Sequence, residues 1–124
     1  MKAHLRDSRD FQRVYKTGRR YEGSFLTAFV KPNDCGLHRL GITASKKALG
    51  NAVERNRAKR LLRETFRSSK IFLEGLQNKY DWVLNGRRAL LSSSISEPRE
   101  ELEKVIVAVA ADERGSSLNK QELA

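Results

Sequence analysis

The sequence predicts a single α+β domain in which helices pack on a small sheet. A chain of 124 residues fits one domain with one modest core. Apolar residues make up 39% of the chain, enough for a globular fold and too many for a disordered one. Helical and strand patterns follow one another in the order αββαβα, which is typical of helices packed on a small sheet.

The first predicted element is a short helix near the N-terminus. Ser8 can cap its start, and Gly18 can close its end. Phe11, Val14 and Tyr15 recur at a spacing that places them on one face. This face is therefore expected to be apolar and aromatic.

Two strands are expected next, because residues 25–31 and 39–44 are rich in strand-forming residues. The Pro32-Asn33-Asp34 sequence between them is a turn signal, so the two strands are expected to pair as a hairpin. Residues 45–51 are predicted to form a loop.

The second half of the chain predicts a helix over residues 52–69 and a third strand over residues 80–87. A last helix is expected from Ser96, which would act as its cap, with Pro98 in the first turn. Apolar residues then recur at helical spacing on one face of this helix.

The domain is predicted to cover residues 1–111, with residues 112–124 as a flexible C-terminal tail. The longest strongly apolar stretch, residues 105–111, is far shorter than the roughly 20 residues that a membrane-spanning helix needs. Cys35 is the only cysteine, so no internal disulfide is possible, which suits a reducing cytosol. A cytoplasmic protein is expected.

The positive charge of the chain is concentrated in one segment. The formal net charge is +10, which predicts a polyanionic partner, either nucleic acid or an anionic membrane. Residues 46–70 hold nine basic and two acidic residues, a net charge of +7. Charge that served solubility alone would not be concentrated in this way.

The predicted helix over residues 52–69 has one apolar and one cationic face. On a helical wheel its Arg55, Lys59, Arg60, Arg63 and Arg67 fall within roughly 140° of one another. Exposed helices usually alternate the sign of their charges, whereas like charges on one stripe repel unless a polyanion neutralises them. The pattern therefore favours a nucleic-acid surface over a solvated charged face.

Asn56 lies within this cationic face. Its side chain both donates and accepts hydrogen bonds, so it could contact a base edge, a ribose hydroxyl or a metal-bound water. Alternatively, Asn56 only tolerates an exposed position near a helix start. The spacing of the residues does not decide between these two readings.

Residues 45–64, SKKALGNAVERNRAKRLLRE, resemble the signature of the bacterial ribonuclease P protein family. Weaker similarities lie outside this motif and in the same order: DFQRVYKTG at residues 10–18, LGIT at 40–43 and DWVL at 81–84. The resemblance implies an α+β fold like that of ribosomal protein S5 domain 2, with a left-handed βαβ crossover, against the general right-handed preference.

The resemblance also implies a function as the non-catalytic protein subunit of an endoribonuclease whose active site is RNA. Such a subunit would help the catalytic RNA to remove the 5′ leader of precursor tRNA, with one copy of the protein per RNA. Mg²⁺ would be bound mainly by the RNA, and no metal or catalytic site is expected in the protein.

The family's binding residues can be carried over to matching positions. Phe11 and Tyr15 could stack on unpaired bases, although aromatic residues at this spacing are more often core residues. Ala28 is the position at which members can carry a further aromatic facing the leader cleft, so that wall is expected to be weaker. The catalytic RNA would be contacted by Lys46, Lys47, Arg55, Arg57 and Arg60, and the leader by Phe11, Tyr15, Asn56, Lys59 and Arg63.

Three other functions compete with this one. A self-sufficient nuclease would need acid and base groups, but the chain has only His4 and His38, and the glutamates from Glu97 to Glu103 look like a solvated helix face. A general RNA-binding module would explain the charge equally well. A helix-turn-helix DNA reader would need a second, tightly packed helix, for which the strands leave no room.

Overall fold

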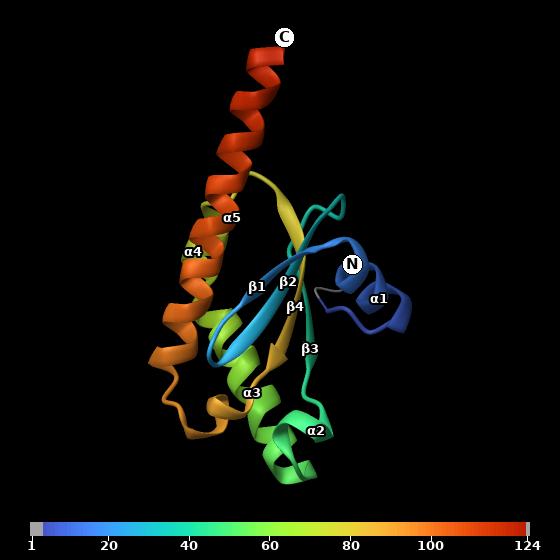
Figure 1. Cartoon of the computed structure of the whole chain (residues 1–124), viewed down its shortest axis with the longest axis vertical. Coiled ribbons are helices and arrows are strands. Elements are labelled where there is room, and N and C mark those ends of the chain that lie inside the picture. Colours follow the sequence, from blue (N-terminus) through green and yellow to red (C-terminus); the bar gives the residue numbers. More distant parts are fainter. Residues whose placement is uncertain (1–3, 124) are drawn as a thin grey trace.

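The sheet of this protein has four strands in the order β1-β2-β4-β3. The structure is a computed structural model, which describes the backbone of residues 4–123 and the side chains of residues 4–115. Helix α1 lies on one side of the sheet, and α3, α4 and α5 lie on the other (Figure 1). The elements are α1 (Ser8–Thr17), β1 (Arg19–Glu22), β2 (Leu26–Asn33), β3 (Arg39–Thr43), α2 (Lys46–Leu49), α3 (Ala52–Ser68), α4 (Lys70–Glu74), β4 (Lys79–Gly86), the 3₁₀ turn η1 (Arg88–Ser92) and α5 (Ser96–Leu123).

The predicted hairpin between the second and third strands is wrong, because β4 lies between them. Strand β2 pairs antiparallel with β4 along its whole length, and β3 pairs with β4 in parallel. The reason is burial: residues 80–84 of β4 are all buried, so this strand needs neighbours on both edges and cover on both faces. The turn signal at Pro32 is also overridden, since β2 continues through Pro32 to Asn33.

Strand β1 was not predicted. Its sequence, RRYE, is mostly charged and exposed, so it carries no apolar alternation. It pairs antiparallel with β2 and forms one edge of the sheet, where charged side chains discourage pairing with other chains.

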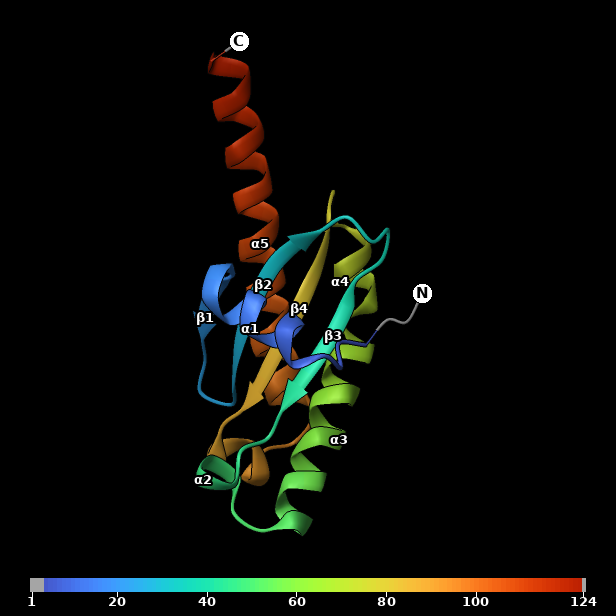
Figure 2. The same cartoon turned by 90° about the vertical axis from the view of Figure 1, so that its right-hand side faces the viewer.

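The connection from β3 through α3 to the parallel strand β4 is left-handed. Figure 2 shows β3 and β4 running side by side in the same direction, with α3 on the far side of the sheet from α1. The crossover implied by the family resemblance is thus confirmed, as is the α+β fold with helices on both faces of a small mixed sheet.

Alternate residues of β2 supply two separate clusters of core residues. Leu26, Ala28 and Val30 are buried with residues of α3 and α5. Phe29 points to the other face, where it packs with Val14 of α1 and Val83 of β4. The main core therefore lies under α3 and α5, and a smaller one lies under α1.

Helix ends agree only partly with the sequence patterns. Asp7, not Ser8, caps α1, because its carboxylate accepts the Arg9 backbone N–H at 2.9 Å. Gly18 ends α1 as predicted. Residues 46–49 of the predicted loop form the one-turn helix α2, and α3 begins at Ala52 as expected, with Asn51 as its cap.

Two glutamates hold helix α5 to the domain. The sequence pattern predicted one of them, Glu101, on a solvated helix face and the other, Glu113, in the C-terminal tail. Glu101 accepts the backbone N–H groups of residues 24–26 at 2.8–2.9 Å, which fixes the turn between β1 and β2. Glu113 is 7% exposed and accepts the backbone N–H groups of Gln77 and Asn78 at 3.0 Å. The packed domain therefore extends beyond residue 111, and α5 continues to Leu123. The flexibility expected of the remaining tail stays a prediction.

In the part of the chain from His4 to Leu123, no helix has both the length and the apolar character to span a membrane.

Candidate nucleic-acid interface

Helix α3 presents a cationic surface that the rest of the domain leaves uncovered. Its apolar face, with Ala58, Leu62 and Thr65, is buried against the sheet and α5. The opposite face carries Asn56, Arg57, Arg60 and Arg63, all exposed, and the half-buried Lys59. The division of the helix into one buried and one cationic face is as the wheel predicted.

The charges on this face are largely unneutralised. Arg67 donates to both oxygens of Glu64, at 2.6 and 2.8 Å. Among residues 4–115, no carboxylate forms an ion pair with Arg57, Lys59, Arg60 or Arg63. Four neighbouring cations that have no ion-pair partner within this part of the chain favour binding of a polyanion.

Arg55 is placed differently from the other arginines. It is half-buried, and its Nε is buried without a hydrogen-bond partner among the described residues. Lys46 and Lys47 lie exposed on α2, immediately before the start of α3. They extend the positive surface around the N-terminal end of α3, where exposed N–H groups also favour anions.

A hollow of about 400 Å³ lies between α3 and the edge strand β3, and we refer to it as the first hollow. Lys59 and Arg63 line it from α3, and Leu40 and Ile42 line it from β3. Residues 4–6 close one side, since the backbone N–H of Leu5 donates to the Leu40 carbonyl at 2.9 Å. The structure thus brings together two of the residues expected to contact the leader.

Phe11 and Tyr15 lie on the opposite face of β3, under α1. The Phe11 ring packs on Gly41 so closely that a Cβ there would lie 2.7 Å from it. The Tyr15 hydroxyl hydrogen-bonds to Thr43 Oγ1 at 2.9 Å and to Asn85 Oδ1 at 2.8 Å. Both rings are half-buried, so they support the small core and still leave surface for a ligand.

The five residues expected to contact the leader therefore fall into two groups on either side of β3. Lys59 and Arg63 share the first hollow, while Phe11 and Tyr15 form the aromatic group. Asn56 is exposed one turn before Lys59. Strand β3 is an edge strand, and among the described residues the N-terminal segment pairs with it only at Leu40, so the two groups are separated by one strand.

The expectation that Ala28 weakens one wall of the cleft is wrong. Ala28 is fully buried in the main core, on the face of β2 that is turned away from α1. The next residue, Phe29, faces α1 and packs edge-on against Tyr15, with 4.8 Å between ring centroids. A shift of one residue along a strand moves a side chain to the other face, so β2 does supply an aromatic here.

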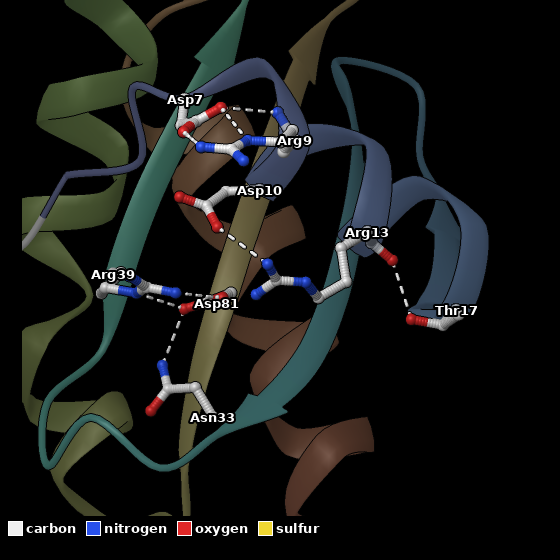
Figure 3. Close-up of polar contacts among 8 residues, drawn as sticks. All are labelled: Asp7, Arg9, Asp10, Arg13, Thr17, Asn33, Arg39 and Asp81. Atoms are coloured by element: carbon white, nitrogen blue, oxygen red, sulfur yellow. Dashed lines mark hydrogen bonds and ion pairs between the residues drawn. The ribbon is translucent and has the colours of Figure 1, made fainter.

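A buried ion pair joins β3 and β4 beneath α1, and no local pattern in the sequence predicts it. Arg39 donates through Nε and one terminal nitrogen to the two oxygens of Asp81, each at 2.7 Å. Asn33 donates to the same carboxylate at 2.8 Å. Figure 3 shows these three side chains converging below Asp10 and Arg13 of α1, which form their own pair. The network ties the end of β2 and the start of β3 to β4 on the face of the sheet that α1 covers.

His38 has a structural role, which removes one of the two candidate bases for a protein-only nuclease. Its Nδ1 accepts the backbone N–H of Tyr80 and the indole N–H of Trp82, both at 3.1 Å. The ring proton therefore lies on Nε2, which is 3.4 Å from the Leu73 carbonyl oxygen. Burial lowers the pKa of His38 below its ordinary value of 6.5, so the folded state favours the neutral ring.

This histidine predicts acid sensitivity of the fold. As the pH falls below about 6.5, the unfolded chain binds a proton that the folded chain resists, so the free energy of unfolding should fall. Urea unfolding at pH 7.5 and 5.5 measures the loss. His4→Gln should keep this pH dependence and His38→Gln should flatten it; equal dependence in both variants would contradict the assignment.

Comparison with known proteins gives one consistent result. The family model described as Ribonuclease P matches residues 1–110. The ribonuclease P protein component of Clostridium kluyveri is 33% identical over 102 residues, covering 82% of this chain and 89% of that protein. The corresponding protein of Caldanaerobacter subterraneus is also 33% identical over 102 residues, covering 82% and 84%.

Solved structures agree with these matches. The Staphylococcus aureus RNase P protein aligns with a TM-score of 0.72 and 31% identity, over 88% of this chain and 96% of that one. The Thermotoga maritima RNase P protein aligns with a TM-score of 0.71 and 28% identity, over 85% and 96%. The chain therefore belongs to the bacterial ribonuclease P protein family, whose members are subunits of the ribonucleoprotein endoribonuclease ribonuclease P in tRNA processing, with the ribonuclease P RNA as partner.

Proposed function

We propose that this chain binds the 5′ leader of precursor tRNA along α3 and docks on the catalytic RNA through the residues around it. The observation that carries the proposal is the row of cations on α3 without carboxylate partners among the described residues. Because Arg57, Arg60 and Arg63 are exposed and Lys59 is half-buried, and none of them forms an ion pair among residues 4–115, RNA phosphates could bind them without breaking ion pairs of that part of the chain.

The leader contacts would come from both sides of β3. Lys59 and Arg63 in the first hollow would bind leader phosphates, and Asn56 would add a hydrogen bond. Phe11 and Tyr15 would contact unpaired bases from the opposite face, an interaction that tolerates any base sequence. Because β3 is an edge strand that residues 4 and 5 cover only at Leu40, one strand of RNA would cross the rest of this edge to reach both groups.

Docking on the catalytic RNA would use the flanking cations. Arg57 and Arg60 are exposed on α3, and Lys46 and Lys47 are exposed on α2 just before it. Arg55 would contribute less contact area because it is half-buried. We propose a complex of one chain with one catalytic RNA, acting in the cytoplasm, where the lone Cys35 would stay reduced.

Mg²⁺ would act through the RNA in this proposal. Among the described residues, no three His, Cys, Asp or Glu side chains gather in a way that could hold a metal ion. The protein's own effect would be electrostatic, because its cations reduce phosphate repulsion where leader and catalytic RNA meet. Lower Mg²⁺ concentrations should then suffice for cleavage.

Reconstitution tests the proposed function. The purified chain should not cleave precursor tRNA, since the active site would belong to the RNA. When added to a bacterial ribonuclease P RNA at low Mg²⁺, it should restore cleavage that the RNA alone performs poorly. Cleavage by the protein alone, or no stimulation at any Mg²⁺ concentration, would contradict the proposal.

A further inference from the structure

A second hollow, of about 350 Å³, adjoins the first along α3. The two hollows share His4, Leu40 and Arg63. The second continues toward α4, so the two form one groove beside β3. Its remaining lining residues are His38, Phe66, Arg67, Lys70 and Leu73.

The cations along this groove form a regular row. Lys59, Arg63 and Arg67 are four residues apart, and Lys70 follows three residues later at the start of α4. Four residues of helix rise by about 6 Å, so a charge recurs at about that interval along one side. Arg67 is paired with Glu64, whereas Lys70 is exposed and, among residues 4–115, forms no ion pair.

The floor of the second hollow is apolar and firmly supported. Leu40 and Leu73 are each 6% exposed, and the half-buried Phe66 packs edge-on against Trp82 with 6.1 Å between ring centroids. His38 is fixed by its hydrogen bonds to Tyr80 and Trp82. Small-molecule sites typically occupy roughly 300–1,000 Å³, and this hollow is near the lower limit.

An apolar floor with a cationic rim matches the two halves of a nucleotide. We propose that the second hollow binds a further unpaired nucleotide of the leader, with its base against Phe66 and Leu73 and its phosphates at Arg63 and Lys70. The inference rests on the proposed function and extends it, since the leader would leave the first hollow and continue along the same groove. An acidic peptide would fit the rim but would leave the apolar floor unused.

Leader length gives the test, in the reconstituted complex of the full chain with catalytic RNA. Affinity is measured for precursor tRNAs whose leaders grow by one nucleotide at a time, with wild type, Lys59→Ala, Lys70→Ala and the control Lys104→Ala. Lys104 lies exposed on α5 and lines neither hollow. Lys59→Ala should weaken binding of short leaders, whereas Lys70→Ala should do so only beyond a threshold length. With leaders longer than this threshold, Lys70→Ala should reduce the slope of log affinity against log salt concentration by about 0.7, which corresponds to the loss of one phosphate contact with single-stranded RNA.

An abasic nucleotide tests the base contact. At the threshold position it should weaken binding to the wild-type complex roughly fivefold or more, as loss of one stacked base would. The abasic substitution should weaken binding much less when Phe66 is replaced by Leu, which keeps an apolar side chain against Trp82. An abasic leader that binds as well as the intact one would overturn the base contact.

The remaining outcomes separate the two proposals. If Lys59→Ala weakens binding and Lys70→Ala leaves the affinity unchanged at every leader length, the second hollow is not a leader site and the proposed function stands. If both variants bind every leader as wild type does, leader binding along α3 is itself wrong.

Discussion

Replacing Lys59 and Arg63 together with Glu should remove most of the reconstituted complex's preference for precursor tRNA over mature tRNA. Both side chains line the first hollow without carboxylate partners among the described residues, so they are free to bind phosphate. Each phosphate contact with a single-stranded nucleic acid contributes about 0.7 to the slope of log affinity against log salt concentration. The loss of two contacts should therefore weaken the affinity for precursor tRNA by about 25-fold at 0.1 M salt. Repulsion by the new carboxylates should weaken it further.

The matched control for this variant is Lys104→Glu with Arg114→Glu, which makes the same change in net charge on α5. Both residues are exposed. Dissociation constants for precursor and mature tRNA should be nearly unchanged in the control, while the α3 variant should lose affinity for the precursor alone. Equal losses for both tRNAs in the α3 variant would argue against leader contact.

Replacing Asp81 with Ala should cause a large loss of stability. The Asp81 side chain is 4% exposed and its partner Arg39 is 18% exposed, so the substitution leaves a poorly solvated guanidinium without its carboxylate. Breaking a buried pair from one side typically costs about 3–5 kcal/mol. Small domains are stable by only about 5–15 kcal/mol, so the variant should be close to unfolding.

Urea unfolding measures this loss, and two further variants locate its cause. Asp34→Ala removes an exposed carboxylate from the nearby loop and should have little effect. Asp81→Leu combined with Arg39→Met should recover much of the lost stability, because it removes both charges. If Asp81→Ala were as stable as Asp34→Ala, the ion pair would not hold β3 and β4 together.

Elements with a strong local pattern were predictable from the sequence. The apolar repeat of α3 and its start at Ala52 depend on nearby residues, and the structure confirms them. The last helix was predicted with Ser96 as its cap, but Ser96 is the first helical residue of α5, and the Ile95 carbonyl accepts the backbone N–H of Arg99. Strand β1 was missed because RRYE has no apolar alternation. The hairpin was mispredicted because a local turn signal carries no information about β4, which lies some 40 residues further along the chain and separates β2 from β3.

Side chains whose partners are distant in sequence could not be assigned. Glu101 looks like one of several solvated glutamates, yet it caps the β1–β2 turn some 75 residues away. Glu113 was placed in a flexible tail, yet it binds the backbone before β4. Each depends on how α5 packs on the sheet, which periodicity does not reveal.

In the candidate site, too, features that depend on local spacing were predictable and features that depend on distant packing were not. The wheel of α3 predicted its cationic face, because the spacing within one helix is fixed by the helix itself. It could not show that Lys59 and Arg63 share a hollow with β3, or that Phe11 and Tyr15 lie on the other side of that strand. Those relations depend on the position of β3 at the edge of the sheet.

Salt dependence of binding tests whether the cationic face of α3 is the RNA-binding surface. Binding of the chain to the catalytic RNA is measured over a range of salt concentrations for wild type, for Arg57→Ala with Arg60→Ala, and for the α5 control Lys104→Ala with Arg114→Ala. The slope of log affinity against log salt should become shallower by about 1.4–1.8 in the α3 variant, for two lost phosphate contacts, and should not change in the control. An unchanged slope in the α3 variant, or an equal change in both, would contradict this role of α3.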